Sequence, residues 1–454
     1  MSGTLQRRDR RHVVIVGGGF AGVTVARRLE KRLDPDWEIY LLSEENYLTY
    51  KPLLPEVVGA SILPSNVVAP LRQMTRRTRL RMVRVEGIDV AAKTVYYRGR
   101  EPGSLNYDEL VLACGQRPRV DLIEGMDRYG NPLASVGDAL HLRNRILARL
   151  EQATIEPDRS TRNWLTRFVV VGGGFSGVEV AGELFDFLCA AVPYYKNVSA
   201  QDCRVTLLHA GDRLLPELSP RLGEVARKNF AKRGINVHLD ARAVRVDRDG
   251  VTLADGERIS GGTVVTTIGT QPQPFTEAVD LPKDRGRFVT APDMSVEGAG
   301  GIWAIGDCAL VPNAWDGEYS PPTAQFAERQ ARTLADNLLA STAGRETREF
   351  RYRPRGQLAS IGHTKAVVEL PGIRFSGFIA WLVWRAFYLV RIPTLARKTR
   401  LYLEWTWAMF FPPDVAHMNF DRTGMASSAV ERRSASEETG SERYERQHQR
   451  SAQA

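Results

Sequence analysis

Short apolar runs and helix-like stretches alternate near the beginning of the chain. The order is an apolar run from His12 to Val16, a glycine-rich turn, a helix-like pattern from Val23 to Arg32, and a second apolar run from Glu38 to Ser43. A strand, a turn, a helix and a second strand in this order predict a parallel β-α-β unit.

The turn between the first run and the helix reads Gly17-Gly-Gly19-Phe20-Ala21-Gly22. In such a turn Gly17 allows the tight bend, Gly19 lets the backbone approach a phosphate, and Gly22 lets the helix pack against the strand. The helix N-terminus then attracts the pyrophosphate of a dinucleotide. A side chain at the tip of the second strand is expected to bind the adenosine ribose. Ser43 and Glu44 compete for that role, and we favour Glu44.

The same pattern returns later as Phe168-Val-Val-Val-Gly172-Gly-Gly174-Phe175-Ser-Gly177-Val-Glu179. One glycine-rich turn also occurs where a helix simply packs closely, whereas a repeated one predicts two dinucleotide sites in one chain. The run from Arg204 to His209 is expected to be the second strand of this unit. Glu179 either supports the start of the helix or contacts a nicotinamide, and we favour the nicotinamide contact.

The strand tip of the second unit departs from the usual pattern. His209 stands where an NAD site offers Asp or Glu to the ribose hydroxyls, and Arg213 follows closely. Without an acid there, nothing repels a 2′-phosphate, so both NADPH and NADH remain open as donors. The alternative is that His209 is a solvated loop residue.

Three segments outside the repeats are also expected near a cofactor. The loop from Asn46 to Glu56 is apolar and bounded by prolines, which suits either the cover of a cofactor ring or core packing. Short strands are expected from Thr78 to Val95, with Val85 as a backbone contact for an adenine. The run from Leu110 to Gly115 predicts a buried strand that ends in glycine, which suits close approach of a ligand.

Two further segments complete the first of the expected sites. The run from Gly301 to Asp307 predicts a buried strand that ends in Gly306-Asp307, where a carboxylate suits the polyol of a flavin. The segment from Ser320 to Ala331 has proline and threonine ahead of a helix, whose N-terminus suits the anionic edge of a reduced flavin. An amphipathic helix from Asp138 to Gln152 is expected to lead into the second unit.

The segment from Phe375 to Phe411 is strongly apolar but carries Arg385 near the middle of its first half. A spanning helix needs about 20 apolar residues without a central charge, so we expect helices that lie in the membrane interface. The four tryptophans between Trp381 and Trp407 suit rings at the headgroup boundary, and the basic run from Arg397 to Arg400 suits anionic lipid. The alternative is a helix pair buried in a dimer interface.

Length and charge narrow the class of protein. A chain of 454 residues predicts two or three domains. The net charge of +9 lies mostly outside any nucleic-acid motif, so an anionic lipid surface is favoured and no nucleic acid is expected. The segment from Met1 to Arg11 lacks the apolar run of a signal peptide, which indicates the cytosol. Beyond Asp421 the chain is polar and is expected to be disordered.

The cysteines give no sign of a metal or disulfide site. Cys114, Cys189, Cys203 and Cys308 are far apart in the sequence and form no C-x-x-C pair. We therefore expect no metal site and no redox-active disulfide beside a flavin. Cys114 and Cys308 are expected to be buried small residues.

Taken with the two glycine-rich turns and Gly306-Asp307, the helix motif Ala324-Gln325-x-Ala327 gives the chain a family likeness. Over roughly residues 11–411 it resembles the type II NADH dehydrogenases, which are single-subunit, flavin-containing NADH:quinone oxidoreductases. The resemblance implies an α/β fold with two Rossmann-like dinucleotide-binding domains, for FAD and NAD(P), and a C-terminal membrane-associating helical segment. We expect the FAD-binding domain over 1–125 and 291–345, the NAD(P)H-binding domain over 126–290, the membrane-associating region over 346–420, and a disordered tail over 421–454.

The resemblance also assigns roles to individual residues. FAD is expected on Gly17, Gly19, Phe20, Ala21, Gly22, Ser43, Glu44, Lys51, Pro52, Val85, Gly115, Gly306, Asp307, Ala324 and Gln325. The nicotinamide cofactor is expected on Gly172, Gly174, Phe175, Gly177, Glu179, His209 and Gly269. Glu179, Gln325 and Glu328 are the expected catalytic residues, with Gln325 and Glu328 at the border of a quinone pocket.

The implied reaction passes a hydride from NADH or NADPH to FAD and then two electrons to a membrane quinone, without proton pumping. Proton uptake is expected through Glu328 or water. The resemblance favours a homodimer that is peripheral, or monotopic, on the cytoplasmic face of the cell membrane. The alternatives are a sulfide:quinone oxidoreductase, which needs a cysteine pair near the flavin; a soluble flavin reductase or apoptosis-inducing-factor-like protein; and a flavin-bearing scaffold with little turnover.

Overall fold

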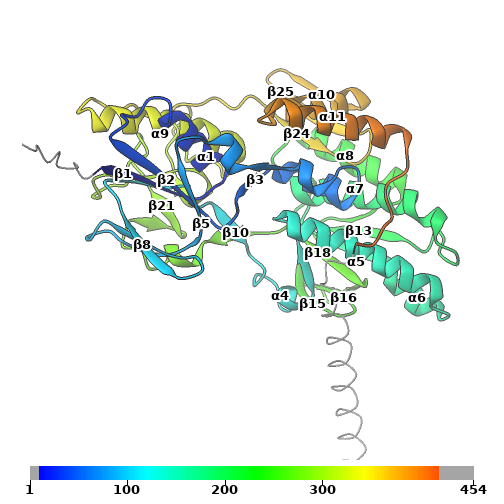
Figure 1. The fold of residues 1–454 in the computed structure, drawn as a ribbon. Helices are drawn as coiled ribbons and strands as arrows, with labels where there is room; N and C mark the ends of the chain where they lie inside the picture. Colours follow the sequence, from blue (N-terminus) through cyan, green and yellow to red (C-terminus); the bar gives the residue numbers. More distant parts are fainter. Residues whose placement is uncertain (1–9, 419–454) are drawn as a thin grey trace, which may run out of the picture. The chain divides into compact units, whose positions relative to one another are not determined.

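The computed structural model describes residues 10–418 (Figure 1). The tail expected over 421–454 lies outside these residues. Residues 10–415 belong to one compact unit, in which two five-stranded parallel sheets form the framework. This arrangement, with helices packed against both sheets, confirms the predicted α/β class.

The first sheet has the strand order β22-β9-β1-β2-β5, and all its strands are parallel. Its strands are β1 (Arg11–Val16), β2 (Trp37–Ser43), β5 (Arg79–Met82), β9 (Glu109–Leu112) and β22 (Ile302–Ala304). The central strands are apolar on both faces because helices cover both faces of such a sheet. Strand β22 comes from a segment that follows the second unit in the chain, so residues before and after that unit together build the first sheet.

The second sheet repeats this plan with the order β11-β18-β12-β13-β14. Its strands are β11 (Gly130–Pro132), β12 (Arg167–Val171), β13 (Arg204–Leu208), β14 (Asn236–His238) and β18 (Thr263–Thr266). The predicted strand from Arg204 therefore ends one residue before His209. All four strand pairs are parallel, as the two β-α-β patterns in the sequence predict.

The long helices of the two units are α1 (Phe20–Leu29), α5 (Val136–Ile155), α7 (Phe175–Ala191), α8 (Pro220–Arg233) and α9 (Ala324–Thr342). All of them except α8, for which there was no prediction, begin within a few residues of the predicted positions. Helix α5 begins earlier than the predicted Asp138, because Ser135 and Asp138 form a reciprocal capping box at its start. Thr323 caps α9 by accepting a hydrogen bond from the Phe326 amide at 3.5 Å.

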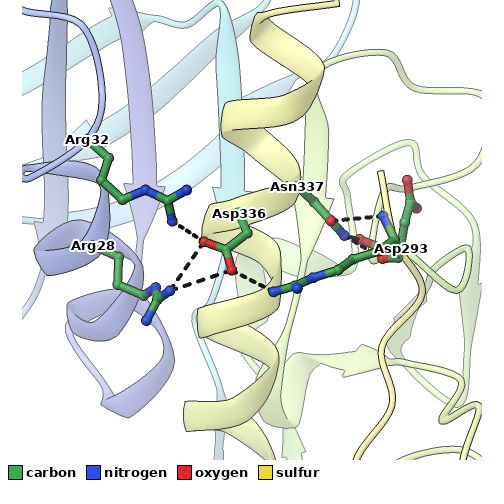
Figure 2. Close-up of polar contacts among 6 residues, drawn as sticks. Arg28, Arg32, Asp293, Asp336 and Asn337 are labelled. Carbon is green, nitrogen blue, oxygen red and sulfur yellow. Dashed lines mark hydrogen bonds and ion pairs between the residues drawn. The ribbon is translucent and has the colours of Figure 1, made fainter. Parts of the chain in front are cut away.

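Helix α9 is bound to α1 through one carboxylate. Figure 2 shows Asp336 of α9 between Arg28 of α1 and Arg32 in the turn after that helix, and Arg348 also donates to it, at 2.6 Å. The neighbouring Asn337 donates from its amide nitrogen to the Asp293 carbonyl at 2.9 Å. Through these contacts α9 and the segments around Asp293 and Arg348 pack against the first helix of the chain.

Smaller antiparallel sheets and short helices complete the framework. The sheets are β3 (Tyr47–Thr49) with β4 (Val68–Pro70); β6 (Arg84–Asp89), β7 (Thr94–Arg98) and β8 (Pro102–Asn106); β10 (Gln116–Pro118) with β19 (Thr270–Pro272); β15 (Ala243–Asp247), β16 (Gly250–Leu253) and β17 (Arg258–Ser260); and β20 (Lys283–Asp284) with β21 (Arg287–Val289), which also pairs in parallel with β23 (Ala309–Leu310). The short helices are η1 (Lys51–Leu53), α2 (Leu54–Val58), η2 (Pro64–Asn66), α3 (Leu71–Met74), α4 (Met126–Tyr129), α6 (Arg159–Leu165), η3 (Val192–Tyr194), η4 (Pro274–Thr276) and η5 (Gly306–Cys308).

The C-terminal region contains a small sheet followed by two helices. Strands β24 (Gln357–Ser360), β25 (Ala366–Leu370) and β26 (Ile373–Gly377) pair antiparallel, and helices α10 (Phe378–Arg391) and α11 (Leu395–Phe410) follow (Figure 1). Among residues 10–418, no helix has both the length and the apolar character needed to cross a bilayer.

The prediction that four tryptophans lie at a headgroup boundary is wrong for three of them. Trp381, Trp384 and Trp405 are buried, and only Trp407 is largely exposed. The reason is that Arg385 lies inside the protein, with its guanidinium 3.7 Å from the centre of the Trp381 ring and 5.0 Å from that of Trp405. The tryptophans therefore shield a buried cation.

The surface of α10 and α11 is nevertheless apolar. We call the exposed apolar side chains of this region the C-terminal apolar face: Phe378, Ile379, Leu382, Val390, Leu395, Tyr402, Leu403, Trp407, Met409, Phe410 and Phe411. The basic run is divided, because Arg397 donates to the Ser65 carbonyl at 2.9 Å whereas Arg400 is exposed. A continuous apolar face of this kind usually marks contact with a membrane or another protein.

Candidate functional site

The first glycine-rich turn has the geometry that its sequence predicts. Gly17 has a φ of +114°, and a Cβ there would lie 2.2 Å from the Ala113 carbonyl oxygen. A Cβ on Gly22 would lie 2.0 Å from the Gly17 carbonyl oxygen. Gly19, in contrast, faces open space at the start of α1. Close packing on one side and free backbone on the other form a cradle for a phosphate.

The tip of β2 places its two candidate side chains differently. Ser43 is buried behind the turn, where a Cβ on Gly18 would lie 2.4 Å from the Ser43 Oγ. Glu44 is exposed and pairs with Arg84 at 2.9 Å between the Nη2 and Oε2 atoms. Val85, the next residue after Arg84, is buried in β6. Glu44 is thus the more accessible of the two candidates.

Asp307 lies at the carboxyl end of the first sheet, directly after β22. Burial raises the pKa of its carboxyl group, and Lys51 and Arg287 oppose that shift. Within the described residues the Asp307 side chain has no hydrogen-bond partner. The predicted loop around Lys51 and Pro52 therefore does reach the neighbourhood of Asp307.

These features fit a bound dinucleotide flavin. Gly19 and Gly115 leave open space beside their α-carbons, and the half-buried Asp307 carboxylate, without a hydrogen-bond partner among the described residues, suits a polyol. Gly115 has a φ of +63° and leads into β10, and Gly269 has a φ of +66° and leads into β19. The antiparallel pair β10 and β19 joins the two units next to these glycines.

The second glycine-rich turn repeats the geometry of the first. Gly172 has a φ of +120°, and a Cβ on Gly177 would lie 1.7 Å from the Gly172 carbonyl oxygen. The turn is bound to its neighbouring strand in the same way, because the Gly172 amide donates to the Leu208 carbonyl as the Gly17 amide does to Leu42. Each turn begins a helix, so both units can hold a pyrophosphate.

His209 is the counterpart of Ser43 in the second unit. Its Nδ1 accepts a hydrogen bond from the Gly173 amide at 3.1 Å, so the ring holds the backbone of the turn in place. Burial lowers the pKa of the imidazole, which keeps the ring neutral at pH 7. His209 is therefore a half-buried residue bonded to the turn and not a solvated loop residue.

Glu217 is a nearby acid that the sequence analysis did not single out. A Cβ on Gly174 would lie 3.3 Å from the Glu217 Oε1, so this carboxylate borders the second turn. It lies in a loop after the strand tip that carries no motif, so no local pattern pointed to it. It brings a negative charge to the site where His209 brings none.

Glu179 lies in α7 with its side chain buried against β24. Its Oε1 accepts a hydrogen bond from the Ser360 amide at 3.1 Å. Burial raises its pKa to about 8, and the Ser360 amide opposes this shift. The alternative that Glu179 supports the helix start is wrong, since the carboxylate is bonded to another strand and Gly174 begins the helix without a side-chain cap.

The N-terminus of α9 lies beside the end of α10 and the loop before η1. Glu328 lies 3.9 Å from Arg391 between the Oε2 and Nη1 atoms. The Tyr50 hydroxyl donates to the Arg391 carbonyl at 3.1 Å, and the Tyr50 ring packs edge-on against Phe20 of the first turn. Gln325 and Ala324 are half-buried at the start of the same helix. The structure thus brings the expected quinone-pocket residues next to the first glycine-rich turn.

Comparison with known proteins agrees with this architecture. Residues 11–331 match the family described as pyridine nucleotide-disulphide oxidoreductase, and residues 355–413 match the NDH2 C-terminal domain. The chain is 31% identical over 424 residues to a type II NADH:quinone oxidoreductase of Mycobacterium tuberculosis, with 89% of each chain covered. It is 30% identical over 410 residues to the demethylphylloquinone reductase of Synechocystis sp., covering 87% of this chain and 96% of the relative.

The chain belongs to the type II NADH:quinone oxidoreductases. Its structure is also similar to that of NDH2 from Plasmodium falciparum in complex with NADH, with a TM-score of 0.84 and 18% identity, covering 90% of this chain and 100% of that one. The resemblance inferred from the glycine-rich turns and the Ala324-Gln325-x-Ala327 motif is thereby confirmed at the level of the family.

Gln330, which binds the backbone next to Asp307, was missed in the sequence analysis of this type II NADH:quinone oxidoreductase. Gln330 is buried in α9, and its Oε1 accepts a hydrogen bond from the Gly306 amide at 2.8 Å. It lies five positions after Gln325, on a face of the helix that the sequence pattern assigns to the core. Its polar character among alanines and leucines was the available signal.

Two cysteines that are far apart in the sequence of this type II NADH:quinone oxidoreductase lie close together in its fold. The thiols of Cys114 and Cys308 are in hydrogen-bond contact, and both cysteines are free. Their separation in sequence is misleading because each follows one of two neighbouring parallel strands, β9 and β22. Cysteine spacing therefore no longer argues against sulfide chemistry, and family membership carries that distinction.

Proposed function

We propose that this chain is an FAD-dependent NAD(P)H:quinone oxidoreductase that works without proton pumping. The observation that carries the proposal is the cradle of Gly17, Gly19 and the unpartnered Asp307, in a chain that matches type II NADH:quinone oxidoreductases over most of its length. When bound, FAD would accept a hydride and release electrons singly or in pairs. The chain's own residues bind and orient the two substrates.

The first glycine-rich turn would hold the FAD pyrophosphate, with Phe20 and Ala21 beginning the helix behind it. Glu44 would bind the adenosine ribose and the Val85 backbone the adenine. Asp307 would accept hydrogen bonds from the polyol, and Lys51 would counter its charge. The remaining contacts would come from residues around the flavin ring: Pro52, Gly115, Gly306, Ala324 and Gln325.

The second turn would hold the nicotinamide cofactor, with Phe175 at its helix start and Gly269 beside it. A neutral His209 neither repels a 2′-phosphate nor pairs with ribose hydroxyls as an acid does. Both NADH and NADPH are therefore proposed as donors. Glu217 at the turn favours NADH, because its negative charge opposes an additional phosphate.

A membrane quinone is the proposed acceptor, with Gln325 and Glu328 at the border of its pocket. Gln325 has no hydrogen-bond partner among residues 10–418, so its amide is available to a quinone carbonyl. The nearby C-terminal apolar face would rest on the membrane, where an apolar quinone is concentrated. Exposed Arg400 would meet anionic lipid.

We further propose a peripheral, monotopic location on the cytoplasmic face of the cell membrane, and a homodimer. The C-terminal apolar face supports the membrane contact, and the family resemblance favours the dimer. Burial of that face between two protomers is the competing arrangement. Light scattering of the detergent-free protein, with and without vesicles, separates the two, because a dimer that uses this face would not bind vesicles.

Donor and acceptor can be identified in one experiment on the purified flavoprotein. NADH, NADPH or sulfide is added without oxygen, and flavin absorbance reports which of them reduces the protein. Menadione is then added, and its conversion to the quinol is measured. We expect bleaching by a nicotinamide nucleotide followed by quinol formation. Bleaching by sulfide alone would identify a sulfide:quinone oxidoreductase, and bleaching without quinol formation would identify a flavin reductase.

A further inference from the structure

A row of acids, two of them buried, runs along one face of α7. Glu179, Glu183 and the half-buried Asp186 are spaced at one-turn intervals, which places their side chains on the same side of the helix. Glu183 is only 4% exposed, and its Oε2 accepts a hydrogen bond from the Ser61 hydroxyl at 3.5 Å. Nothing in the hydride transfer proposed above uses Glu183.

The charges around Glu183 do not balance. Arg233 pairs with Asp186 at 2.6 Å, so that pair is neutral. Arg385 acts on both Glu56 and Glu183 and lies 3.9 Å from Glu56, whereas Glu179 is subject to the negative charge of Glu56. Three buried carboxylates beside one guanidinium cannot all be ionised, so this cluster must hold protons at neutral pH.

The pKa shifts agree with this count. Burial raises the pKa of Glu183 well above its ordinary value, and Glu56 and Asp186 raise it further. Arg385 and Arg233 act in the opposite direction without cancelling the effect. Glu56 is similarly raised by burial, although Trp405 donates to its Oε2 at 2.7 Å.

One end of this row opens toward the surface. A cavity of about 670 Å³ lies against Glu183 and Asp186, with Ser61, His363 and Glu404 also in its wall. Leu63, Trp407 and Phe411 form part of the same wall and are each about half exposed or more. Water that enters this cavity therefore reaches the Glu183 carboxyl group.

The other end of the row leads toward the expected quinone pocket. Burial and the negative charge of Glu179 raise the pKa of the Tyr388 hydroxyl, and the positive charge of Arg391 lowers it. Arg391 lies 3.9 Å from Glu328, three residues after Gln325. The charge of Glu56 acts on both Glu183 and Glu179, so Glu56 links the acid at the cavity to the acid nearer the start of α9.

The reaction needs such a route. A hydride from NADH carries two electrons and one proton, whereas a quinol contains two added protons, so one proton per turnover must come from water. We propose that Glu183 takes up this proton from the cavity and passes it through Glu179 to the quinone. The inference rests on the proposed function, and it replaces the earlier expectation that Glu328 or bulk water supplies the proton.

The test compares two electron acceptors in the holoenzyme with a Glu183→Gln substitution. Menadione takes up protons when reduced, whereas ferricyanide takes up electrons alone. We expect the menadione rate to fall by at least about tenfold and the ferricyanide rate to stay unchanged. Glu183→Asp should restore part of the menadione rate. Glu404→Gln, in the wall of the same cavity, is the matched control and should leave both rates unchanged.

Two further measurements supplement the variant rates: the first needs no turnover, and the second needs no variant. Infrared spectra of the wild-type protein at pH 7 should show a band from a protonated carboxylic acid, and Glu183→Gln should reduce it. In the wild type, the menadione rate should also be slower in D₂O, and the ferricyanide rate should not.

Equal losses with both acceptors, no loss with menadione, or an unchanged infrared band would each overturn the relay. If Glu183→Gln does not fold, Glu183→Asp is judged by the same acceptor comparison. A wild-type protein that reduces ferricyanide but no quinone would instead overturn the proposed function.

Discussion

The Gln330 side chain holds the Gly306 amide through a 2.8 Å hydrogen bond in the interior of the first unit. Gly306 has a φ of +72° and directly precedes Asp307, so this contact sets where the half-buried carboxylate points. Helix α9 thereby supports the proposed flavin site through Gln330 as well as through its N-terminus.

Replacing Gln330 by leucine should therefore weaken flavin retention. A buried amide without a partner costs about 1–3 kcal/mol, and the turn at Asp307 would relax. We expect lower thermal stability and a smaller ratio of FAD to protein after gel filtration. Arg332→Ala, at an exposed position of the same helix, is the control and should change neither. Full flavin retention in Gln330→Leu would show that the contact does not position Asp307.

Replacing His209 by glutamate should favour NADH over NADPH. A carboxylate at this strand tip can pair with ribose hydroxyls and repels a 2′-phosphate. We expect the ratio of kcat/KM for NADH to that for NADPH to rise by about tenfold, which corresponds to about 1.4 kcal/mol. His209→Asn keeps a neutral acceptor for the Gly173 amide and should leave the ratio near that of the wild type. An unchanged ratio in the glutamate variant would mean that the side chain at position 209 does not distinguish the ribose of NADH from the 2′-phosphorylated ribose of NADPH.

The C-terminal apolar face can be tested without disturbing the core. Deleting the region from Phe375 would remove the buried Trp381, Trp384 and Trp405 and would destabilise the protein. Serine at Val390, Leu395 and Phe410 instead changes side chains that are mostly exposed.

This triple variant should keep its nicotinamide-dependent flavin reduction but lose binding to vesicles that contain anionic lipid. Each apolar side chain buried in lipid contributes roughly 1.5–3 kcal/mol, so the affinity should fall by at least about tenfold. Ile155→Ser removes another exposed apolar side chain, on α5, and should sediment with vesicles as the wild type does. Wild-type sedimentation of the triple variant would assign the apolar face to another contact.

The buried Glu179 should give the protein a distinctive dependence of stability on pH. Its folded pKa of about 8 lies above the ordinary value of 4.5, so the folded state favours the protonated form. This contribution to stability is fully present below pH 4.5 and is lost as the pH rises toward 8.

Glu179→Gln should remove that slope, because glutamine stays neutral throughout. Unfolding by urea at several pH values measures the difference between variant and wild type. We expect the variant to gain in relative stability as the pH rises from 5 to 8. The exposed Glu44→Gln is the control. Parallel pH profiles for the wild type and Glu179→Gln would show that the carboxyl group is ionised across this range.

The sequence predicted the features that short segments determine. The glycine-rich turns, the strands on either side of them and the start of α9 all depend on residues within a few positions, and the structure has them where expected. The cradle around Gly17 could be drawn in advance because the turn, the strand and the helix are continuous in the chain.

The features that depend on distant segments could not be predicted in this way. Cys114 and Cys308 meet because β9 and β22 are neighbours in the sheet, and no local pattern announces that pairing. Arg385 suggested a helix that lies in the membrane interface, whereas its side chain is buried 3.9 Å from Glu56, which comes far earlier in the chain. Glu217 and Gln330 border the two sites from positions that carry no motif.

The insertion of β22 beside β9 also has a consequence for synthesis on the ribosome. Residues 130–266 contain every strand of the second sheet, whereas the first sheet lacks an edge until residues 302–304 emerge. Because domains tend to fold as units during translation, the middle of the chain should mature before its beginning. A nascent chain that is arrested before Ile302 would therefore expose the unpaired edge of β9 to chaperones.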